Sequence, residues 1–165
     1  MSMLVINANL EHIEVIQRIA YETWPVAYGN IISAAQITYM LEKAYDTTVL
    51  TQQIQGGHQF LLAQNNNGEF VGFAGIGREP MEAMYKLHKL YVLPTAQGTG
   101  AGKALLQAAC DLAKFQGGEQ MILQVNRQNP AVAFYQQQGF AILYEQDLPI
   151  GDGYFMNDYI MGKAL

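Results

Sequence analysis

The chain has few of the features that would tie it to an oxidising compartment, a membrane or a nucleic acid. Only one of its 165 residues is cysteine, so no disulfide can form within the chain, which suits a reducing compartment. No apolar run approaches the length of a membrane span, and the first residues lack the basic-then-apolar pattern of a signal peptide. The net charge of −5 argues against a general binder of nucleic acids or anionic membranes. We therefore expect a cytoplasmic protein without a nucleic-acid or membrane partner.

Apolar residues, in contrast, are abundant and make up 50% of the chain. A chain of this composition is not expected to be disordered, and 165 residues are enough for one domain with a core. No repeat, low-complexity stretch or change of composition marks a boundary. We therefore expect residues 1–165 to form a single domain.

Hydrophobic periodicity predicts a strand and two helices in the first third of the chain. The strand covers residues 3–9, and Asn9 caps a helix that ends at Pro25. Ser33 and Gln36 have the spacing of a capping box and open the second helix. A further short helix is expected over residues 48–55, closed by Gly56 and Gly57.

The remaining segments alternate between strands and helices. Strands are expected over 58–64, 69–78, 84–92 and 120–125, and two more are expected in FAILYEQ and DYIMGKAL, with PIGDGYF as a loop between them. A glycine-rich stretch leads into a third long helix before the fifth strand, and Asn129-Pro130 opens a last short helix. The order β-α-α-β-β-β-α-β-α-β-β predicts an α/β (α+β) fold with a mixed central sheet and helices on both faces.

Three glycines fall within six positions of QGTGAGK, residues 97–103, directly before the third long helix. Each glycine costs roughly 0.5–1 kcal/mol relative to alanine in regular structure. Three of them together indicate that this segment requires a backbone without side chains. The first turn of a helix has unpaired N–H groups and a partial positive charge. The pattern therefore predicts that the amides of Gly98–Lys103 hold a phosphate or pyrophosphate, with an ordinary flexible turn as the alternative.

The spacing of these glycines fits neither of the two common nucleotide motifs. A P-loop has serine or threonine after its Gly-Lys pair, whereas Lys103 is followed by Ala104, and Gln97 stands where the first glycine should be. A dinucleotide fingerprint reads G-x-G-x-x-G near the start of a βαβ unit, whereas this chain has G-x-G-x-G late in the sequence.

Two longer runs resemble signatures of the GNAT family of N-acetyltransferases. KLHKLYVLPTAQGTGAGKALLQAACDLA, residues 86–113, is similar to the acetyl-CoA motif Q/R-x-x-G-x-G/A after a strand that ends in an apolar-x-Val pattern. The motif is formed here by Gln97, Gly100 and Gly102. VNRQNPAVAFYQQQGF, residues 125–140, is similar to the second signature of the family. Together the two runs cover about a quarter of the chain, in the expected order.

The resemblance implies a GNAT fold in which the fourth and fifth strands splay apart and acetyl-CoA, the cosubstrate, binds in the gap. The cofactor-binding residues implied are Leu90, Tyr91, Val92, Gln97, Gly98, Thr99, Gly100, Ala101, Gly102, Lys103, Asn126, Asn129 and Phe134. Other roles stay open for five of them. Leu90, Val92 and Phe134 also fit the core, Asn129 before proline fits a helix cap, and Lys103 fits an exposed helix face.

The implied reaction is acetyl transfer from a thioester to an amine. An amine with a pKa of about 10.4 is mostly protonated at neutral pH, so a base or a desolvating pocket must favour its neutral form. By resemblance Tyr135 is the general acid that protonates the departing thiolate, and a backbone N–H of Tyr91 or Val92 stabilises the oxyanion. Lys86 stands where many relatives carry a glutamate, which leaves His88 or a water chain to a more distant carboxylate as the base.

The acceptor is expected to be a small primary amine, because the first and last segments resemble the PaiA-like polyamine acetyltransferase branch of the family. The implied pocket walls are the aromatic side chains Trp24, Tyr28, Tyr154 and Tyr159. A protein N-terminus or lysine is the alternative acceptor, and an idle acetyl-CoA-binding module is the alternative to an enzyme. Carboxylates such as Asp152 or Asp158 would suit an oligoamine.

Two further expectations concern the single cysteine and the assembly. Cys110 lies among alanines in the third long helix, and we interpret it as a packing residue, with a covalent acetyl-cysteine route as the alternative. Edge strands in this fold often pair between subunits, so the resemblance also implies a homodimer. No metal is expected.

Overall fold

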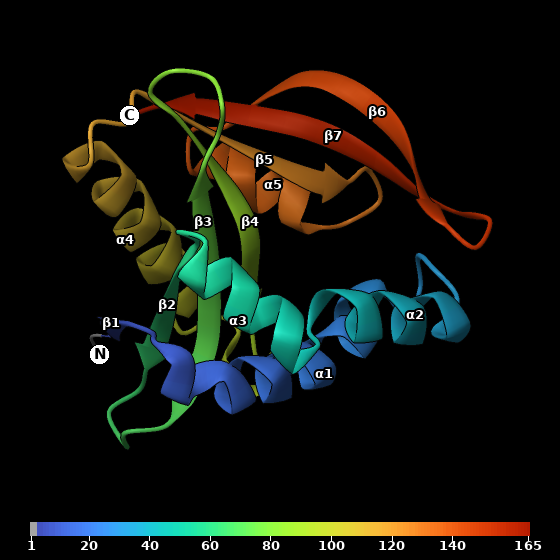
Figure 1. Ribbon diagram of the computed structural model, residues 1–165, viewed down its shortest axis with the longest axis horizontal. Coiled ribbons are helices and arrows are strands. Elements are labelled where there is room, and N and C mark those ends of the chain that lie inside the picture. Colours follow the sequence, from blue (N-terminus) through green and yellow to red (C-terminus); the bar gives the residue numbers. More distant parts are fainter. Residues whose placement is uncertain (1–2) are drawn as a thin grey trace.

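Seven strands form one mixed sheet within residues 3–165, which are the residues that the computed structural model describes (Figure 1). The strand order is β1-β2-β3-β4-β5-β7-β6, and every neighbouring pair is antiparallel except β4 and β5. The strands are β1 (Leu4–Asn7), β2 (Gln59–Gln64), β3 (Phe70–Arg78), β4 (Met84–Val92), β5 (Gln120–Asn126), β6 (Ala141–Gly151) and β7 (Tyr154–Ala164). The helices are α1 (Ile13–Tyr28), α2 (Ala34–Ala44), α3 (Thr47–Gln55), α4 (Ala101–Phe115) and α5 (Ala131–Gln137), with the 3-10 turns η1 (Leu10–His12) and η2 (Pro94–Ala96).

Helices cover both faces of the sheet, as two neighbouring residues of β3 show. The ring of Phe73 packs against Tyr45, which lies between α2 and α3, whereas Gly72 lies beside Leu105 of α4. Successive residues of a strand point to opposite faces, so the first three helices lie on one face and α4 on the other (Figure 1). The predicted fold class and element order are confirmed, with α3 added at the place of the expected short helix.

Apolar side chains from both faces form one buried cluster. Cys110 on α4 is part of it, with 6% of its surface exposed, so it packs as predicted. Burial also raises the pKa of the Cys110 thiol, which lowers its reactivity and argues against a covalent route. Within residues 3–165, no helix has both the length and the apolar character needed to cross a lipid bilayer.

The prediction that α1 ends at Pro25 is wrong, because the helix continues to Tyr28. Proline has no N–H and therefore costs one helical hydrogen bond. The carbonyl left without a partner belongs to Tyr21, which is exposed to water. The extra turn buries Tyr28 and closes with the N–H of Gly29 donating to the carbonyl of Pro25 at 3.0 Å. Burial of the tyrosine thus outweighs the lost bond.

The loop expected over PIGDGYF is also wrong, because these residues belong to a long hairpin. β6 runs to Gly151 and β7 starts at Tyr154, which leaves only Asp152 and Gly153 in the turn. Both turn residues have positive φ, 54° and 78°, as a type I′ turn requires. Asp-Gly is a preferred pair for this turn, so the sequence did contain the signal.

The capping box predicted for α2 is only half formed. The Ser33 hydroxyl accepts from the N–H of Gln36 at 3.1 Å, as predicted. The Gln36 amide does not return to the cap and instead donates to the carbonyl of Phe155 on β7 at 3.3 Å. This contact joins α2 to the β6–β7 hairpin, which extends toward α2 in Figure 1.

The predicted splay between β4 and β5 is confirmed. Parallel pairing joins Met84–Leu87 to Gln120–Leu123 and then stops. Beyond this point β4 continues along β3, and β5 continues along β7. The last residues of β4 therefore have no strand beside them on their β5 side.

Candidate active site

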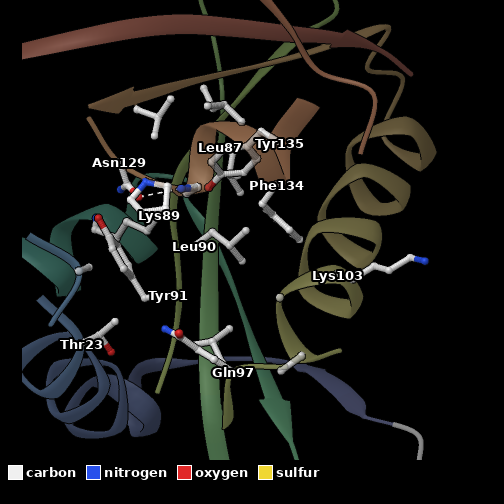
Figure 2. Close-up of a pocket in the computed structure, with 18 of the residues that line it drawn as sticks. Thr23, Leu87, Lys89, Leu90, Tyr91, Gln97, Lys103, Asn129, Phe134 and Tyr135 are labelled. Atoms are coloured by element: carbon white, nitrogen blue, oxygen red, sulfur yellow. Dashed lines mark hydrogen bonds between the residues drawn. The ribbon is translucent and has the colours of Figure 1, made fainter. Parts of the chain in front are cut away.

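A cavity of about 630 Å³ opens where β4 and β5 separate (Figure 2). Its walls come from the end of β4, the glycine-rich loop with the start of α4, the end of β5, and α5. Thr23 and Tyr28 of α1 close it on one side. A concave space of this size suits a small molecule or a cofactor.

The glycine-rich loop presents free amides to this cavity. Gly98 and Gly100 have φ values of 81° and 87°, a region that residues with a Cβ rarely adopt. α4 begins at Ala101, and its N-cap, Gly100, has no side chain to cap the helix. Among the described residues, 3–165, the N–H groups of Ala101, Gly102 and Lys103 find no acceptor. They are therefore available to an anion, and a diphosphate fits this arrangement.

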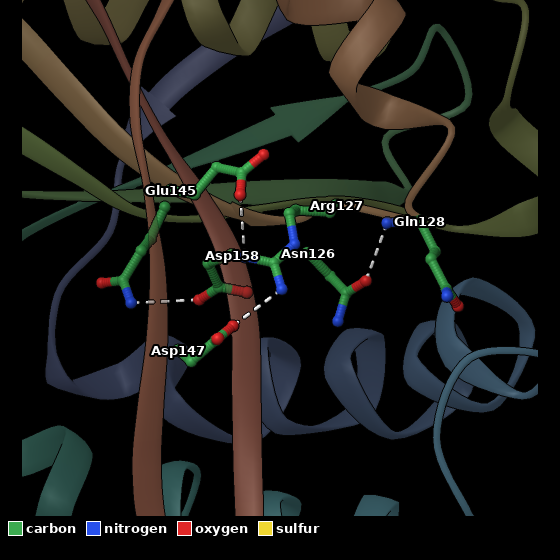
Figure 3. Close-up of polar contacts among 7 residues, drawn as sticks. Asn126, Arg127, Gln128, Glu145, Asp147 and Asp158 are labelled. Carbon is green, nitrogen blue, oxygen red and sulfur yellow. Dashed lines mark hydrogen bonds and ion pairs between the residues drawn. The ribbon is translucent and has the colours of Figure 1, made fainter.

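Three of the polar side chains predicted to hold the cofactor have other partners or directions. The Thr99 hydroxyl donates to the carbonyl of Ala96, and Thr99 does not line the cavity. The Lys103 side chain is exposed and extends away from the other labelled residues (Figure 2). Asn126 lies outside the cavity lining, and its Oδ1 accepts from the N–H of Gln128 at 2.9 Å (Figure 3).

Asn129 and Phe134 both line the cavity. The Oδ1 atom of Asn129 accepts from the N–H of Ala131 at 2.9 Å, so this side chain caps α5. The Phe134 ring lies close to Gly102 at the start of α4. Of the two roles left open for Asn129, the structure shows the cap.

Leu90, Tyr91 and Val92 line the cavity with an open main-chain edge. The Tyr91 side chain packs on the first-helix side, where its hydroxyl lies 2.9 Å from that of Tyr28 and its ring contacts Trp24 and Phe73. The side chain of Tyr91 thus serves packing, while its backbone can pair with an extended ligand.

Tyr135 reaches the cavity from α5 (Figure 2). Its ring meets Phe134 and Phe140 edge to face, with centroid distances of 5.4 Å and 5.9 Å. Burial raises the pKa of the Tyr135 hydroxyl well above its ordinary value. The hydroxyl is therefore protonated at neutral pH and able to donate.

His88 lines the cavity but is a weak base in this position. It is the extra residue of a β-bulge, because Gly75 pairs with Lys89 and Ile76 with Leu87. Its ring stacks on His58 at 4.6 Å. Loss of hydration, followed by the positive charges of neighbouring basic groups, lowers the pKa of His88. His88 as the base stays a prediction, and the surroundings of its ring do not favour that role.

Lys89 also lines the cavity, and the sequence analysis did not single it out. Its ammonium donates to Oε1 of Gln53 at 3.0 Å and lies over the rings of Tyr45 and Phe60. Burial lowers the pKa of Lys89 to about 8. No sequence signal could have shown this, because the aromatic contacts come from distant segments.

Of the predicted acceptor walls, the structure brings only Tyr28 into the cavity. Trp24 lies in the core with 6% of its surface exposed, and Tyr154 packs on Tyr39 near the tip of the hairpin. Asp152 is exposed in the hairpin turn, and Tyr159 on β7 does not line the cavity. The hairpin therefore contributes less to this cavity than the resemblance implied.

A chain of polar contacts runs from β4 to β7 beside the cavity. The Lys86 ammonium donates to Oε1 of Gln124 at 2.9 Å, and Nε2 of Gln124 donates to Oδ2 of Asp158 at 3.0 Å. Nearby, Arg127 pairs with Asp147 at 2.7 Å and with Glu145 at 3.8 Å (Figure 3). Within residues 3–165, no group of histidine, cysteine and acidic side chains has an arrangement that could hold a metal ion.

Comparisons with known proteins agree with this geometry. Residues 30–148 match the family model described as an acetyltransferase (GNAT) domain. The uncharacterised N-acetyltransferase YuaI of Bacillus subtilis is 30% identical over 133 residues, which are 79% of this chain and 75% of that protein. The N-alpha-acetyltransferase RimI of Mycobacterium tuberculosis is 29% identical over 132 residues, 72% of this chain and 80% of that protein.

Among solved structures, PaiA N-acetyltransferase from Thermoplasma acidophilum, in complex with coenzyme A, is 26% identical to this chain. The two superpose with a TM-score of 0.82 over 100% of both chains. Enzymes of this family take the acetyl group from acetyl-CoA. The chain belongs to the GNAT family of acetyltransferases.

Proposed function

We propose that this protein transfers the acetyl group of acetyl-CoA directly to the primary amine of a small molecule. The observation that carries the proposal is one cavity that combines the free amides of α4, the open edge of β4 and the buried hydroxyl of Tyr135. Acetyl-CoA supplies an acetyl group activated as a thioester. Every other requirement of the reaction falls on residues of this chain.

Each part of the cavity has one task in the proposed reaction. The amides of Ala101, Gly102 and Lys103 hold the diphosphate, and the main chain at the end of β4 pairs with the extended pantetheine arm. A backbone N–H of Tyr91 or Val92 stabilises the negative charge that develops on the carbonyl oxygen. The Tyr135 hydroxyl gives its proton to the departing sulfur.

A polyamine-like molecule is the proposed acceptor. Tyr28 gives the cavity an aromatic wall, and Asp158 places a carboxylate close to it. The net charge of −5 also favours a cationic acceptor. The likeness to PaiA supports this branch of the family. The likeness to RimI favours a second candidate, the N-terminus of a protein.

The proposal is tested by titrating the protein with coenzyme A and then measuring thiol release from acetyl-CoA with a panel of amines. The panel contains spermidine, free lysine and a short peptide with a free N-terminus, and mass spectrometry identifies the acetylated product. We expect turnover with spermidine. Cofactor binding without thiol release from any amine would indicate an idle module, and no cofactor binding would refute the proposal.

We also propose a homodimer that forms along β6. Within residues 3–165 this strand pairs with β7 alone and lies at the edge of the sheet, and its exposed side chains include Ile142, Leu143, Tyr144 and Leu148.

A single domain over residues 1–165 and a cytoplasmic location stay predictions from the sequence.

A further inference from the structure

Asp158 is the only acidic or basic side chain among the buried residues of 3–165, and none of its surface is exposed. A buried carboxylate is costly unless its oxygens are hydrogen-bonded. One oxygen, Oδ2, accepts from Gln124. The other, Oδ1, is buried and has no hydrogen-bond partner among these residues. The carboxylate therefore has an unused acceptor that the fold itself does not supply with a donor.

Asp158 has no direct ion pair among the described residues. Within residues 3–165, no lysine, arginine or histidine nitrogen lies within the 4.0 Å of an ion pair with either oxygen. Lys86 donates to Gln124, and Arg127 is paired with the two carboxylates of β6. A buried carboxylate that stabilises a fold is usually paired with a cation, and Asp158 forms no ion pair with Lys86 or Arg127. Its burial therefore has no evident stabilising role.

Gln124 connects Asp158 to the cavity. Its side chain lines the cavity one residue beyond Leu123, where the pairing of β5 with β4 stops. Its oxygen accepts from Lys86 and its nitrogen donates to Asp158, so the amide has a fixed orientation. One side chain therefore separates the buried carboxylate from the place where β4 and β5 open.

The charged and titratable groups around Asp158 come from three elements. Loss of hydration is the largest effect on the carboxyl and raises its pKa above the ordinary value. The hydrogen bond from Gln124, Arg127 after β5 and Lys86 on β4 act in the opposite direction. Tyr28 of α1 lies on the cavity side. An aspartate of this kind is a stronger proton acceptor than an exposed one.

We propose that Asp158 takes the proton of the acceptor's ammonium group. The ammonium enters from the cavity on the side of Gln124 and donates a hydrogen bond to Oδ1, the oxygen that lacks a donor. This inference rests on the proposed function and names the base for it. It also specifies the acceptor as a cationic primary amine.

The proton balance closes with two groups of the chain. The ammonium gives one proton to Asp158, and the neutral nitrogen then bonds to the carbonyl carbon as the carbon–sulfur bond breaks. Tyr135 gives its proton to the sulfur and regains one from the nitrogen. Asp158 releases its proton to solvent after the product leaves, so the sum is an amide, a thiol and one proton.

Asp158→Asn tests the proposal, because it keeps the shape of the side chain and removes the charge. At pH 7 we expect kcat/KM to fall by at least about 100-fold. Affinity for spermidine, measured by calorimetry with coenzyme A bound, should fall by at least about tenfold, while coenzyme A affinity stays within twofold. The urea midpoint should stay or rise, because the buried charge is gone.

Asp147→Asn is the matched control. It also removes one carboxylate of the β6–β7 hairpin, but Asp147 is exposed and paired with Arg127, so activity should stay within twofold. Wild-type kcat/KM and spermidine affinity in Asp158→Asn would overturn the proposal. Loss of activity together with a lower urea midpoint would overturn it in favour of a structural role.

A second variant keeps the proposal testable if Asp158→Asn does not fold. Gln124→Met removes the donor to Oδ2 and leaves the carboxylate in place, so the acidic limb of the kcat/KM profile should move to higher pH. An unmoved limb would overturn the proposal. Coenzyme A binding without any amine binding by the wild type would also overturn it, whereas failure to bind coenzyme A refutes the proposed function instead.

Discussion

The hydroxyl of Tyr135 lies inside the cavity, and the rings of Phe134 and Phe140 pack against its own ring. Tyr135→Phe removes only the oxygen, so the packing and the fold should be kept. We expect kcat to fall by about 10²- to 10⁴-fold at neutral pH, which is the usual contribution of a general acid. Steady-state thiol release measures kcat, and calorimetry should show coenzyme A affinity within about threefold of the wild type.

Tyr144→Phe is the control for this variant. It removes the same oxygen from an exposed tyrosine on β6, which does not line the cavity, and should leave kcat unchanged. If Tyr135→Phe turned over at the wild-type rate at neutral and alkaline pH, the departing sulfur would have to take its proton from another group.

Lys89 gives a prediction on the pH dependence of stability. Its pKa is about 8 in the folded protein and 10.5 in the unfolded chain, so between these values the unfolded chain binds more protons. The free energy of unfolding should therefore rise with pH across this window. Relative to Lys89→Met, the wild type should gain about 1 kcal/mol between pH 7 and pH 9.5, after a discount for partial exposure.

Urea unfolding of both proteins at the two pH values measures this gain. Lys89→Arg keeps its charge across the window and should show no such gain relative to Lys89→Met. An equal response of the wild type and Lys89→Arg would mean that the Lys89 ammonium is not held out of water in the folded protein.

The same residues show what a sequence can reveal about a site. The role of Tyr135 is implied by the resemblance of residues 125–140 to a family signature, whereas the glycines of the loop follow from their spacing. The lowered pKa of Lys89 and the free oxygen of Asp158 depend on neighbours from other elements. Local patterns therefore identify the backbone part of the site, while its electrostatics need the three-dimensional neighbours.

At the scale of elements, the start of α4 depends on glycine for a geometric reason that a single variant can test. Gly100 has a φ of 87° and Gly117, just past the other end of the helix, has a φ of 92°. A Cβ at either position would meet nothing within 4 Å, so alanine costs only backbone strain, about 1–2 kcal/mol. Both Gly100→Ala and Gly117→Ala should lower the free energy of unfolding by that amount.

Only Gly100→Ala should also weaken coenzyme A binding, by at least about fivefold, because strain at the N-cap shifts the amides that follow it. Gly117→Ala is matched in backbone strain and lies away from the cavity lining, so it should bind coenzyme A like the wild type. Calorimetry on both variants makes the comparison. Equal coenzyme A affinities of the two variants would mean that the glycine-rich loop does not bind the diphosphate.

The elements that the sequence analysis predicted wrongly share a physical cause. At Pro25 the sequence shows the cost of one lost hydrogen bond, because proline itself causes it. The burial of Tyr28, which outweighs that cost, depends on the fold and cannot be seen in the sequence. In the last hairpin, the Asp152-Gly153 turn is a local signal, whereas a proline such as Pro149 is rare inside a strand. An edge strand tolerates proline, and only the sheet order shows that β6 is an edge.

At the scale of the whole molecule, the cavity exists because β5 stays paired with β7 while its pairing with β4 ends partway along the strand. Its first residues pair with β4, whereas its whole length pairs with β7, from Gln120 to Asn126. β7 lies far along the chain from β4, so no local pattern predicts which strand will hold β5. The splay was nevertheless predicted, because the resemblance to the family supplied the long-range arrangement that composition and periodicity could not.

The edge strand β6 leads to a prediction for the assembly. Tyr144 and Leu148 are exposed at 57% and 37% on a strand that pairs on one side only. Light scattering should give a mass of twice 18.3 kDa for the wild type, and Tyr144→Lys with Leu148→Lys should give the single-chain mass, because charges on an edge oppose pairing. Phe115→Lys is the control, since Phe115 is 90% exposed at the end of α4 and is equally apolar. A wild-type mass of 18.3 kDa at millimolar concentration would contradict the homodimer through β6.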